Sequence, residues 1–184
     1  ELGLDELDVR ADVDELLAGG QLCRVAGALA VPWPVVDSLL AIDGVRLALV
    51  NPAAPRVDHG DLPGEWIGAD LDGHAARLTF AKPAARAKLG PFLVPGVLGD
   101  PVPDVDADDI ARHLVLGAWR IFGALEAALG QVVEHVRARK QFGQPLAEFQ
   151  AVRFAIADAS VALRGLDELA KFTTWRLVTA EPAH

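Results

Sequence analysis

The segment Arg139-Lys140-Gln141-Phe142-Gly143-Gln144-Pro145-Leu146-Ala147-Glu148-Phe149-Gln150 decides how this chain is interpreted. Gly143 and Pro145 are typical turn residues, so the segment predicts a sharp reversal of the chain. Its cations lie beside Phe142 in a protein that is acidic as a whole. Such a cluster suits the last turn of a helix, where positive charge complements the helix dipole. It also suits an anion-binding site, because guanidinium groups match the geometry of phosphate oxygens.

Apolar residues at helical spacing flank this turn on both sides. Residues 110–136 carry an apolar stripe of about eight turns, and residues 149–172 carry another. Asp104, Asp106, Asp108 and Asp109 precede the first stripe, where carboxylates favour a helix N-terminus. The short connection predicts an antiparallel helical hairpin. Two helices of this length rarely stand alone, so we expect further helices, from missing C-terminal sequence or a partner subunit, to complete a bundle.

The rest of the chain divides into two zones. Residues 1–43 are mainly helical in pattern, with one helix over residues 12–29, a break at Pro32-Trp33-Pro34 and a short helix over residues 35–42. Residues 44–103 are rich in proline and hold short apolar runs, which predict strands at 45–50, 66–67, 75–80 and 92–94. We expect a small, mostly antiparallel sheet there, and a turn rather than a metal loop at Asp70-Leu71-Asp72-Gly73.

Composition limits the possible functions. The chain has 184 residues, 26 acidic against 17 basic side chains and a net charge of −9, which disfavours a general nucleic-acid binder. Its hydrophobic fraction of 52% excludes intrinsic disorder. A single cysteine, Cys23, excludes an internal disulfide framework, and we expect it to be buried. No apolar stretch is long enough to span a bilayer, and residues 1–5 lack a secretion-signal pattern, so we expect a cytoplasmic protein.

The segment at 139–150 resembles the acyl-CoA dehydrogenase family. That family carries the pattern R-x-x-F-G between two long C-terminal helices, followed by F/H-Q and then A-D, and Phe149-Gln150 and Ala157-Asp158 match those later positions. The order of zones, helical then β then helical, is similar to the family's three-domain plan, and Glu1-Leu2-Gly3-Leu4 resembles the E-L-G-L of its N-terminal domain. The resemblance implies a mainly α protein with a small β domain: a helical part at 1–43, a β domain at 44–103 and a C-terminal helical bundle at 104–184.

The resemblance also implies a cofactor site for FAD. Arg139 would contact the FAD pyrophosphate, and Gln141 and Phe142 would border the ADP portion. The adenosine end would be lined by Leu146, Phe149 and Gln150. In this family such residues reach a flavin bound mainly by a neighbouring subunit, so an oligomer is implied as well. No metal is expected, because His59 and His74 lack partners at ligand spacing; we expect both to be exposed.

The chain departs from the family pattern at two places. The β-domain strand W-x-S/T, which contacts the flavin ring, has only Trp66-Ile67-Gly68 as a counterpart. No residue matches the catalytic glutamate of the family: His113 stands at one of its two places, and the other would lie beyond this chain. A histidine near a helix start is more often a surface or packed residue, so the catalytic residue stays unassigned. Glu126 and Glu134 are interpreted as solvated charges.

These features favour a subunit of an FAD-dependent acyl-CoA dehydrogenase, which removes hydrogens from the α and β carbons of an acyl-CoA thioester and passes electrons to an electron-transfer flavoprotein. The departures favour a heterotetramer with a second acyl-CoA dehydrogenase subunit, similar to actinobacterial pairs that act on steroid side chains. A homo-oligomer with its base in missing sequence is the alternative. A non-enzymatic helical interaction module is the alternative from another class.

Overall fold

The computed structural model describes residues 7–80 and 93–179. The opening residues 1–4, which contributed to the resemblance, lie outside this part of the chain. The elements are α1 (Val13–Ala28), α2 (Val35–Leu39), β1 (Arg46–Leu49), β2 (Arg56–Asp58), β3 (Trp66–Ala69), β4 (Ala75–Phe80), β5 (Leu93–Val102), α3 (Ala107–Ala138), β6 (Lys140–Gln141), β7 (Gln144–Pro145), a 3-10 helix (Leu146–Glu148) and α4 (Gln150–Thr179).

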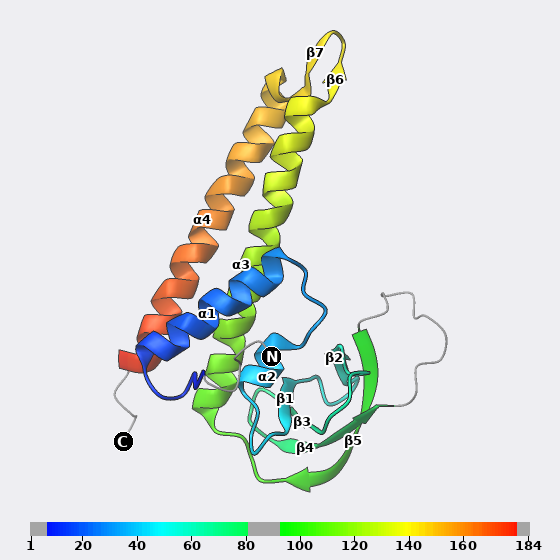
Figure 1. Ribbon diagram of the computed structural model, residues 1–184, viewed down its shortest axis with the longest axis vertical. Coiled ribbons are helices and arrows are strands. Elements are labelled where there is room, and N and C mark those ends of the chain that lie inside the picture. Colours follow the sequence, from blue (N-terminus) through cyan, green and yellow to red (C-terminus); the bar gives the residue numbers. More distant parts are fainter. Residues whose placement is uncertain (1–6, 81–92, 180–184) are drawn as a thin grey trace.

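The two long helices α3 and α4 lie antiparallel and form a hairpin that projects away from the rest of the molecule (Figure 1). Helix α3 begins after Asp106, whose side chain accepts a hydrogen bond from the Asp108 amide at 2.7 Å. It ends at Arg139, where the backbone turns extended. The predicted helical hairpin and its aspartate-rich start are therefore confirmed.

Helix α1 crosses α3 at very short range. Gly27 of α1 and Gly123 of α3 face the opposite helix so closely that a Cβ at either position would collide with a backbone carbonyl oxygen, that of Arg120 or of Arg24. Gly19 and Gly20, which interrupt the apolar pattern of α1, are also buried, and a Cβ there would meet the Val9 side chain at 2.6 Å or the Trp119 ring at 2.8 Å. These two glycines therefore do not break the helix; they leave room for neighbouring side chains, whereas Gly27 allows the backbones of α1 and α3 to approach.

The small sheet has the strand order β1-β3-β4-β5-β2. Strands β1 and β3 pair in parallel and the other neighbours are antiparallel, as the sequence predicts for a mostly antiparallel unit. Two details differ. Strand β2 has no counterpart among the predicted strands, and β5 runs on to Val102 through Pro95 and Pro101. Both prolines are exposed, at places where a missing amide hydrogen bond costs little. The predicted strand residue 92 lies outside the described residues.

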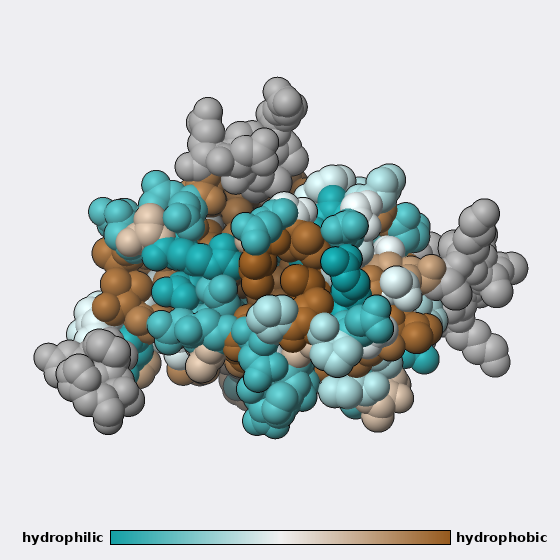
Figure 2. Space-filling view, turned by 90° about the horizontal axis from the view of Figure 1, so that it is seen from below, coloured by the Kyte–Doolittle hydropathy of each residue, from teal (hydrophilic) through white to brown (hydrophobic). Residues whose placement is uncertain are grey.

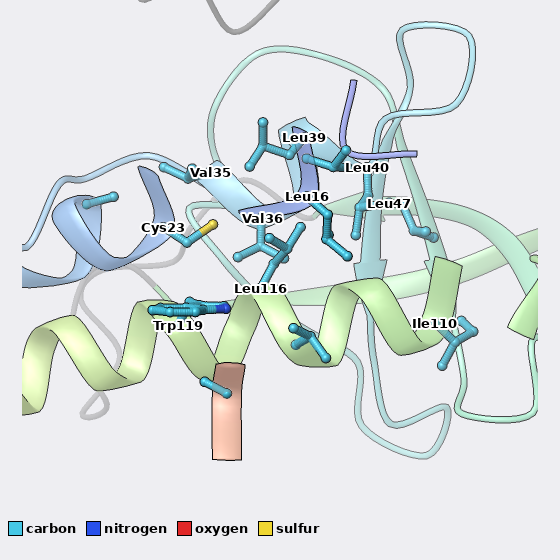
Figure 3. Close-up of a cluster of buried hydrophobic side chains, with 14 of the residues drawn as sticks. Leu16, Cys23, Val35, Val36, Leu39, Leu40, Leu47, Ile110, Leu116 and Trp119 are labelled. Atoms are coloured by element: carbon cyan, nitrogen blue, oxygen red, sulfur yellow. The ribbon is translucent and has the colours of Figure 1, made fainter. Parts of the chain in front are cut away.

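One hydrophobic core joins the helices to the sheet, so residues from α1, α2, β1, α3 and α4 pack together (Figure 3). Trp119 is 1% exposed at its centre and donates a hydrogen bond from Nε1 to the Thr174 hydroxyl at 3.1 Å. Cys23 is fully buried, as predicted, and this burial raises the pKa of its thiol to about 12. His59 is also buried, so the prediction that it is exposed was wrong, whereas His74 is exposed as predicted.

The surface of the helical hairpin carries exposed apolar side chains on both helices. Large side chains that are about half exposed or more lie along both helices: Leu114, Ile121, Leu125 and Val132 on α3, and Phe154, Val161, Leu169, Phe172 and Trp175 on α4. Apolar side chains also gather in the middle of the face seen from below (Figure 2). None of the helices within residues 7–80 and 93–179 combines the length and apolarity needed to cross a membrane.

Candidate functional site

The cationic segment forms the tip of the helical hairpin. After α3 ends, β6 and β7 pair through Gln141 and Gln144, and the two residues between them turn the chain. Phe142 has φ +51° and Gly143 has φ +84°, the left-handed conformation that a tight two-residue hairpin turn requires. Glycine adopts it without strain, whereas phenylalanine rarely does. The turn therefore holds the Phe142 ring out from the protein.

The tip residues lie on a surface that faces solvent. Phe142 is 92% exposed, and its ring lies edge-to-face with the ring of Phe149, with the centroids 6.3 Å apart. The amide of Leu146 donates to the Arg139 carbonyl oxygen at 2.8 Å, which fixes the start of the 3-10 helix beside the end of α3. The side chains of Arg139 and Gln141 are exposed and have no hydrogen-bond or ion-pair partner among the described residues.

All six residues assigned to a cofactor on the basis of the resemblance thus share this one tip: Arg139, Gln141, Phe142, Leu146, Phe149 and Gln150. An unpaired guanidinium beside an aromatic face can hold an anionic group attached to a flat ring system, as in a dinucleotide. The donor set therefore fits the ADP portion of FAD. The tip lies at the end of the hairpin remote from the sheet, so residues of the sheet cannot complete this site within one chain (Figure 1).

The sheet offers little to a flavin ring. Trp66 in β3 is 3% exposed, with its ring packed edge-on against Phe80 at 5.6 Å and beneath the Arg46 guanidinium at 5.1 Å. A Cβ at Gly68 would lie 2.9 Å from Leu98 Cδ2, because neighbouring side chains fill that space. This position therefore supplies no hydroxyl and has no room for one, and the sheet does not fit the hydroxyl contact that the W-x-S/T pattern makes.

His113 is a packed residue of α3 with a specific partner. Its Nε2 lies 2.9 Å from Asp37 Oδ1 of α2, and the two side chains are 14% and 11% exposed. Both residues border a cleft of about 240 Å³ between α3, α2 and the sheet. Sequence reasoning missed Asp37, because the two residues are 76 positions apart and no local pattern connects them.

The remaining charged candidates are structural. Glu126 is exposed and forms a bidentate ion pair with Arg24 of α1, the shortest distance being 2.7 Å. Glu134 and His135 are exposed on α3. Asp70 caps the turn between β3 and β4 through its bonds to the Asp72 and His74 amides, which confirms a turn there. The ligand atoms of Asp70, Asp72 and His74 lie within 4.8 Å of one another, so His74 does have partners at ligand spacing, contrary to the expectation; Asp72 and His74 are exposed, and the Asp70 carboxylate already accepts hydrogen bonds.

Comparison with solved structures defines the class of fold. A steroid acyl-CoA dehydrogenase variant, Tcur3481-Tcur3483, superposes with a TM-score of 0.65 at 15% identity and covers 90% of this chain. The ChsE4-ChsE5 complex from Mycobacterium tuberculosis gives 0.64 at 17% identity, also over 90% of the chain. The match covers 62% of each of those chains. The predicted acyl-CoA dehydrogenase fold, mainly α with a small sheet, is thereby confirmed.

Residues 111–184 match the acyl-CoA dehydrogenase C-terminal domain, and the resemblance to that family is confirmed. Acyl-CoA dehydrogenase FadE28 of M. tuberculosis is 38% identical over 88 residues, which are 42% of this chain and 26% of that protein. The probable acyl-CoA dehydrogenase YngJ of Bacillus subtilis is 27% identical over 159 residues, 82% of this chain and 39% of that protein. The chain therefore spans well under half the length of these relatives.

Proposed function

We propose that this chain is a cytoplasmic subunit of an FAD-dependent acyl-CoA dehydrogenase, an enzyme that forms an α,β double bond in an acyl-CoA thioester. The observation that carries the proposal is the tip of the hairpin. A cation without a hydrogen-bond or ion-pair partner in the described chain and an aromatic ring that is 92% exposed stand at the end of the pair of helices α3 and α4. A purely structural helix connection has no need of an aromatic side chain held in solvent, because its exposure costs free energy.

Each tip residue has a role in this proposal. Arg139 binds the FAD pyrophosphate, and Gln141 and Phe142 flank the ADP portion. At the adenosine end lie Leu146, Phe149 and Gln150. The chemistry that FAD supplies when bound is acceptance of a hydride from the β-carbon of the substrate. The protein's part at this tip is to bind and orient the nucleotide half.

The tip serves a neighbouring chain, because it points away from its own sheet. We favour a heterotetramer with a second acyl-CoA dehydrogenase subunit. The support is Gly68, where Leu98 and Val50 occupy the space that a flavin-contacting hydroxyl would need. The likeness to a steroid acyl-CoA dehydrogenase and to the ChsE4-ChsE5 complex supports a steroid side-chain CoA as substrate. An electron-transfer flavoprotein would accept the electrons.

Two other functions fit parts of the structure. A homo-oligomeric acyl-CoA dehydrogenase uses the same tip and draws its base from sequence outside this chain. A non-enzymatic interaction module would use the apolar outer faces of α3 and α4 and would leave the tip without a ligand.

Flavin absorbance of the purified full-length protein separates these functions. Expressed alone, the half-site subunit binds no FAD, and co-expression with a second acyl-CoA dehydrogenase chain of the same organism yields a flavin-containing complex. Stoichiometric FAD on the protein alone would favour the homo-oligomer. A colourless preparation in both cases would favour the interaction module.

The cofactor role of the tip is tested by Arg139→Ala in the flavin-containing preparation. We expect a lower FAD content with unchanged helicity and melting temperature, because the Arg139 side chain is exposed and forms no hydrogen bond or ion pair within the described chain. Arg137→Ala is the matched control, since Arg137 is an exposed cation two residues earlier, in the last turn of α3 and outside the motif. Equal flavin content in Arg139→Ala and the wild type would contradict the assignment.

A further inference from the structure

Helix α3 carries an apolar stripe along most of its length. We call it the α3 stripe, and its residues are Leu114, Ala118, Ile121, Leu125, Ala128 and Val132. Its four large side chains are 48% to 59% exposed. Leu114 and Val132 each lie nine residues from Gly123, which is about two and a half helical turns. Because Gly123 faces α1, the stripe lies on the opposite side of α3.

The side of α3 that carries the stripe has no charged side chain. Between residues 114 and 133 the sequence holds two charged residues, Arg120 and Glu126. Each is three residues from Gly123, toward the α1 side of the helix. Arg120 pairs with Asp58 at 2.8 Å and Glu126 pairs with Arg24 at 2.7 Å. A helix face that is apolar over this length is typical of a surface covered by another element.

The spacing within the α3 stripe indicates that the covering element is a helix. Its residues follow one another at intervals of four, three, four, three and four positions, the repeat by which side chains of paired helices interdigitate. Ala118 and Ala128 separate the larger side chains and leave room for those of a facing helix. The stripe is about 27 Å long, which matches five turns of such a helix.

The stripe has nearly the same order of residues in both directions. Counted outward from Gly123, Ile121 and Leu125 come first, then the two alanines, then Leu114 and Val132. A helix with a similar stripe therefore fits it in the antiparallel direction. In a chain of the same fold the sheet lies near the start of α3, so antiparallel pairing brings the tip of one chain to the sheet of the other (Figure 1). Parallel pairing would place both tips together, away from both sheets.

We propose that the α3 stripe is the surface on which the second acyl-CoA dehydrogenase subunit lays its corresponding helix, antiparallel to α3. This inference rests on the proposed function and adds the contact surface and the orientation of the partner. A second copy of this chain carries the same stripe, but it would bring a sheet that does not fit the flavin-ring contact at Gly68. The pairing therefore joins two different chains, and the tip meets a sheet that completes the cofactor site.

A charge in the middle of the stripe tests this surface. The full-length protein is purified in complex with a second acyl-CoA dehydrogenase chain of the same organism, and dissociation is measured by analytical ultracentrifugation. Leu125→Glu should raise the dissociation constant at least about a hundredfold, because pairing buries its carboxylate without a partner. Val161→Glu is the matched control, since Val161 is an exposed apolar residue of α4 outside the stripe, and its complex should dissociate like the wild type.

Three results would overturn the inference: equal dissociation of the Leu125→Glu and wild-type complexes, no association of the wild-type chains, or a lower melting temperature of the Leu125→Glu subunit alone. The last result, if absent in Val161→Glu, would show that the chain's own sequence covers the stripe. If the Leu125→Glu complex stayed intact while Arg139→Ala lost FAD, the proposed function would stand without this interface. Absence of FAD from every preparation would contradict the proposed function instead.

Cross-linking tests the orientation. Gln131→Cys places a thiol at an exposed position of α3 near the tip end of the stripe, whereas Cys23 is buried and its burial raises the pKa of that thiol to about 12. A maleimide–benzophenone reagent is attached at position 131, the complex is irradiated, and the linked peptides are identified by mass spectrometry. We expect links to the first turns of the partner's corresponding helix. Links to its last turns, or to peptides of this chain alone, would overturn the inference.

Discussion

The two ends of the helical hairpin differ in how tightly their side chains pack, although the same two helices form both. At the lower end, α3 meets α1 through Gly27 and Gly123 so closely that neither position tolerates a side chain, and Trp119 fills the adjoining core. At the tip, the ring of Phe142 is almost fully exposed. The lower end therefore stabilises the fold, and the tip is free to serve another molecule. A residue's effect on stability should depend on which end it occupies.

The largest expected effect tests the close crossing. Gly123→Ala places a Cβ against the Arg24 carbonyl, so α1 must move, and overpacking of this kind costs about 3 kcal/mol or more. The measurement is the free energy of unfolding from urea titration. Gly130→Ala on the same helix is the control and should be neutral or stabilising by up to about 1 kcal/mol, because Gly130 has free space and alanine favours helix. A similar loss of unfolding free energy in both variants would contradict the close contact of the α1 and α3 backbones at Gly123.

A smaller loss is expected from Trp119→Phe. The substitution removes the hydrogen bond to Thr174 and leaves a gap in a position only 1% exposed, which together cost about 2 kcal/mol. Thr174 keeps a partner, since its hydroxyl also donates to the Ala170 carbonyl at 2.7 Å. Thermal unfolding followed by circular dichroism measures the change. Wild-type stability in Trp119→Phe would mean that α4 is not held at this end.

At the tip, we expect a substitution to lower the free energy of unfolding only through its effect on backbone conformation. Gly143→Ala forces a residue with a Cβ to adopt φ +84°, at about 1 kcal/mol. Phe142→Ala should leave the free energy of unfolding nearly unchanged, because the ring buries little surface. The pair of variants is compared by urea titration and by flavin content. If Phe142→Ala destabilised the chain by as much as Trp119→Phe, the contrast between the two ends would fail.

The smallest effect concerns the exposed pair Asp70 and His74. A hydrogen bond and the charge of Asp70 raise the pKa of His74. Desolvation acts to raise the pKa of Asp70. The hydrogen bonds from His74 and from the backbone amides outweigh it, so the pKa of Asp70 is lowered. The contribution of His74 to stability is lost as pH rises through its raised pKa, and that of Asp70 is lost as pH falls through its lowered pKa. The pair therefore contributes most between about pH 4 and pH 6.5.

This pH dependence can be measured by NMR titration of the His74 ring. In Asp70→Asn, which keeps an acceptor for the turn amides, the pKa of His74 should return toward its ordinary value. An unchanged titration curve would show that the two side chains do not interact in solution.

Sequence reasoning was most successful where structure is local. The start of α3 followed from the aspartates around Asp106, whose side chain caps the helix, and the turn followed from Gly143 and Pro145. The resemblance supplied the fold, and it brought together the six tip residues because they are close in sequence. Their role with FAD stays a prediction. Pairings across long separations were missed: Asp37 with His113, and the buried setting of His59, depend on how α2 and the sheet pack, which no local pattern encodes.

The single cysteine gives this protein an internal reporter. Cys23 lies fully buried in α1 beside the crossing with α3, and burial keeps its thiol protonated at neutral pH. A thiol reagent reaches Cys23 when that crossing opens. The labelling rate under native conditions therefore measures how often the crossing is open. With no other cysteine in the chain, the signal has one origin. A partner that binds the folded form but not the opened form slows this labelling, so its binding can be followed at Cys23.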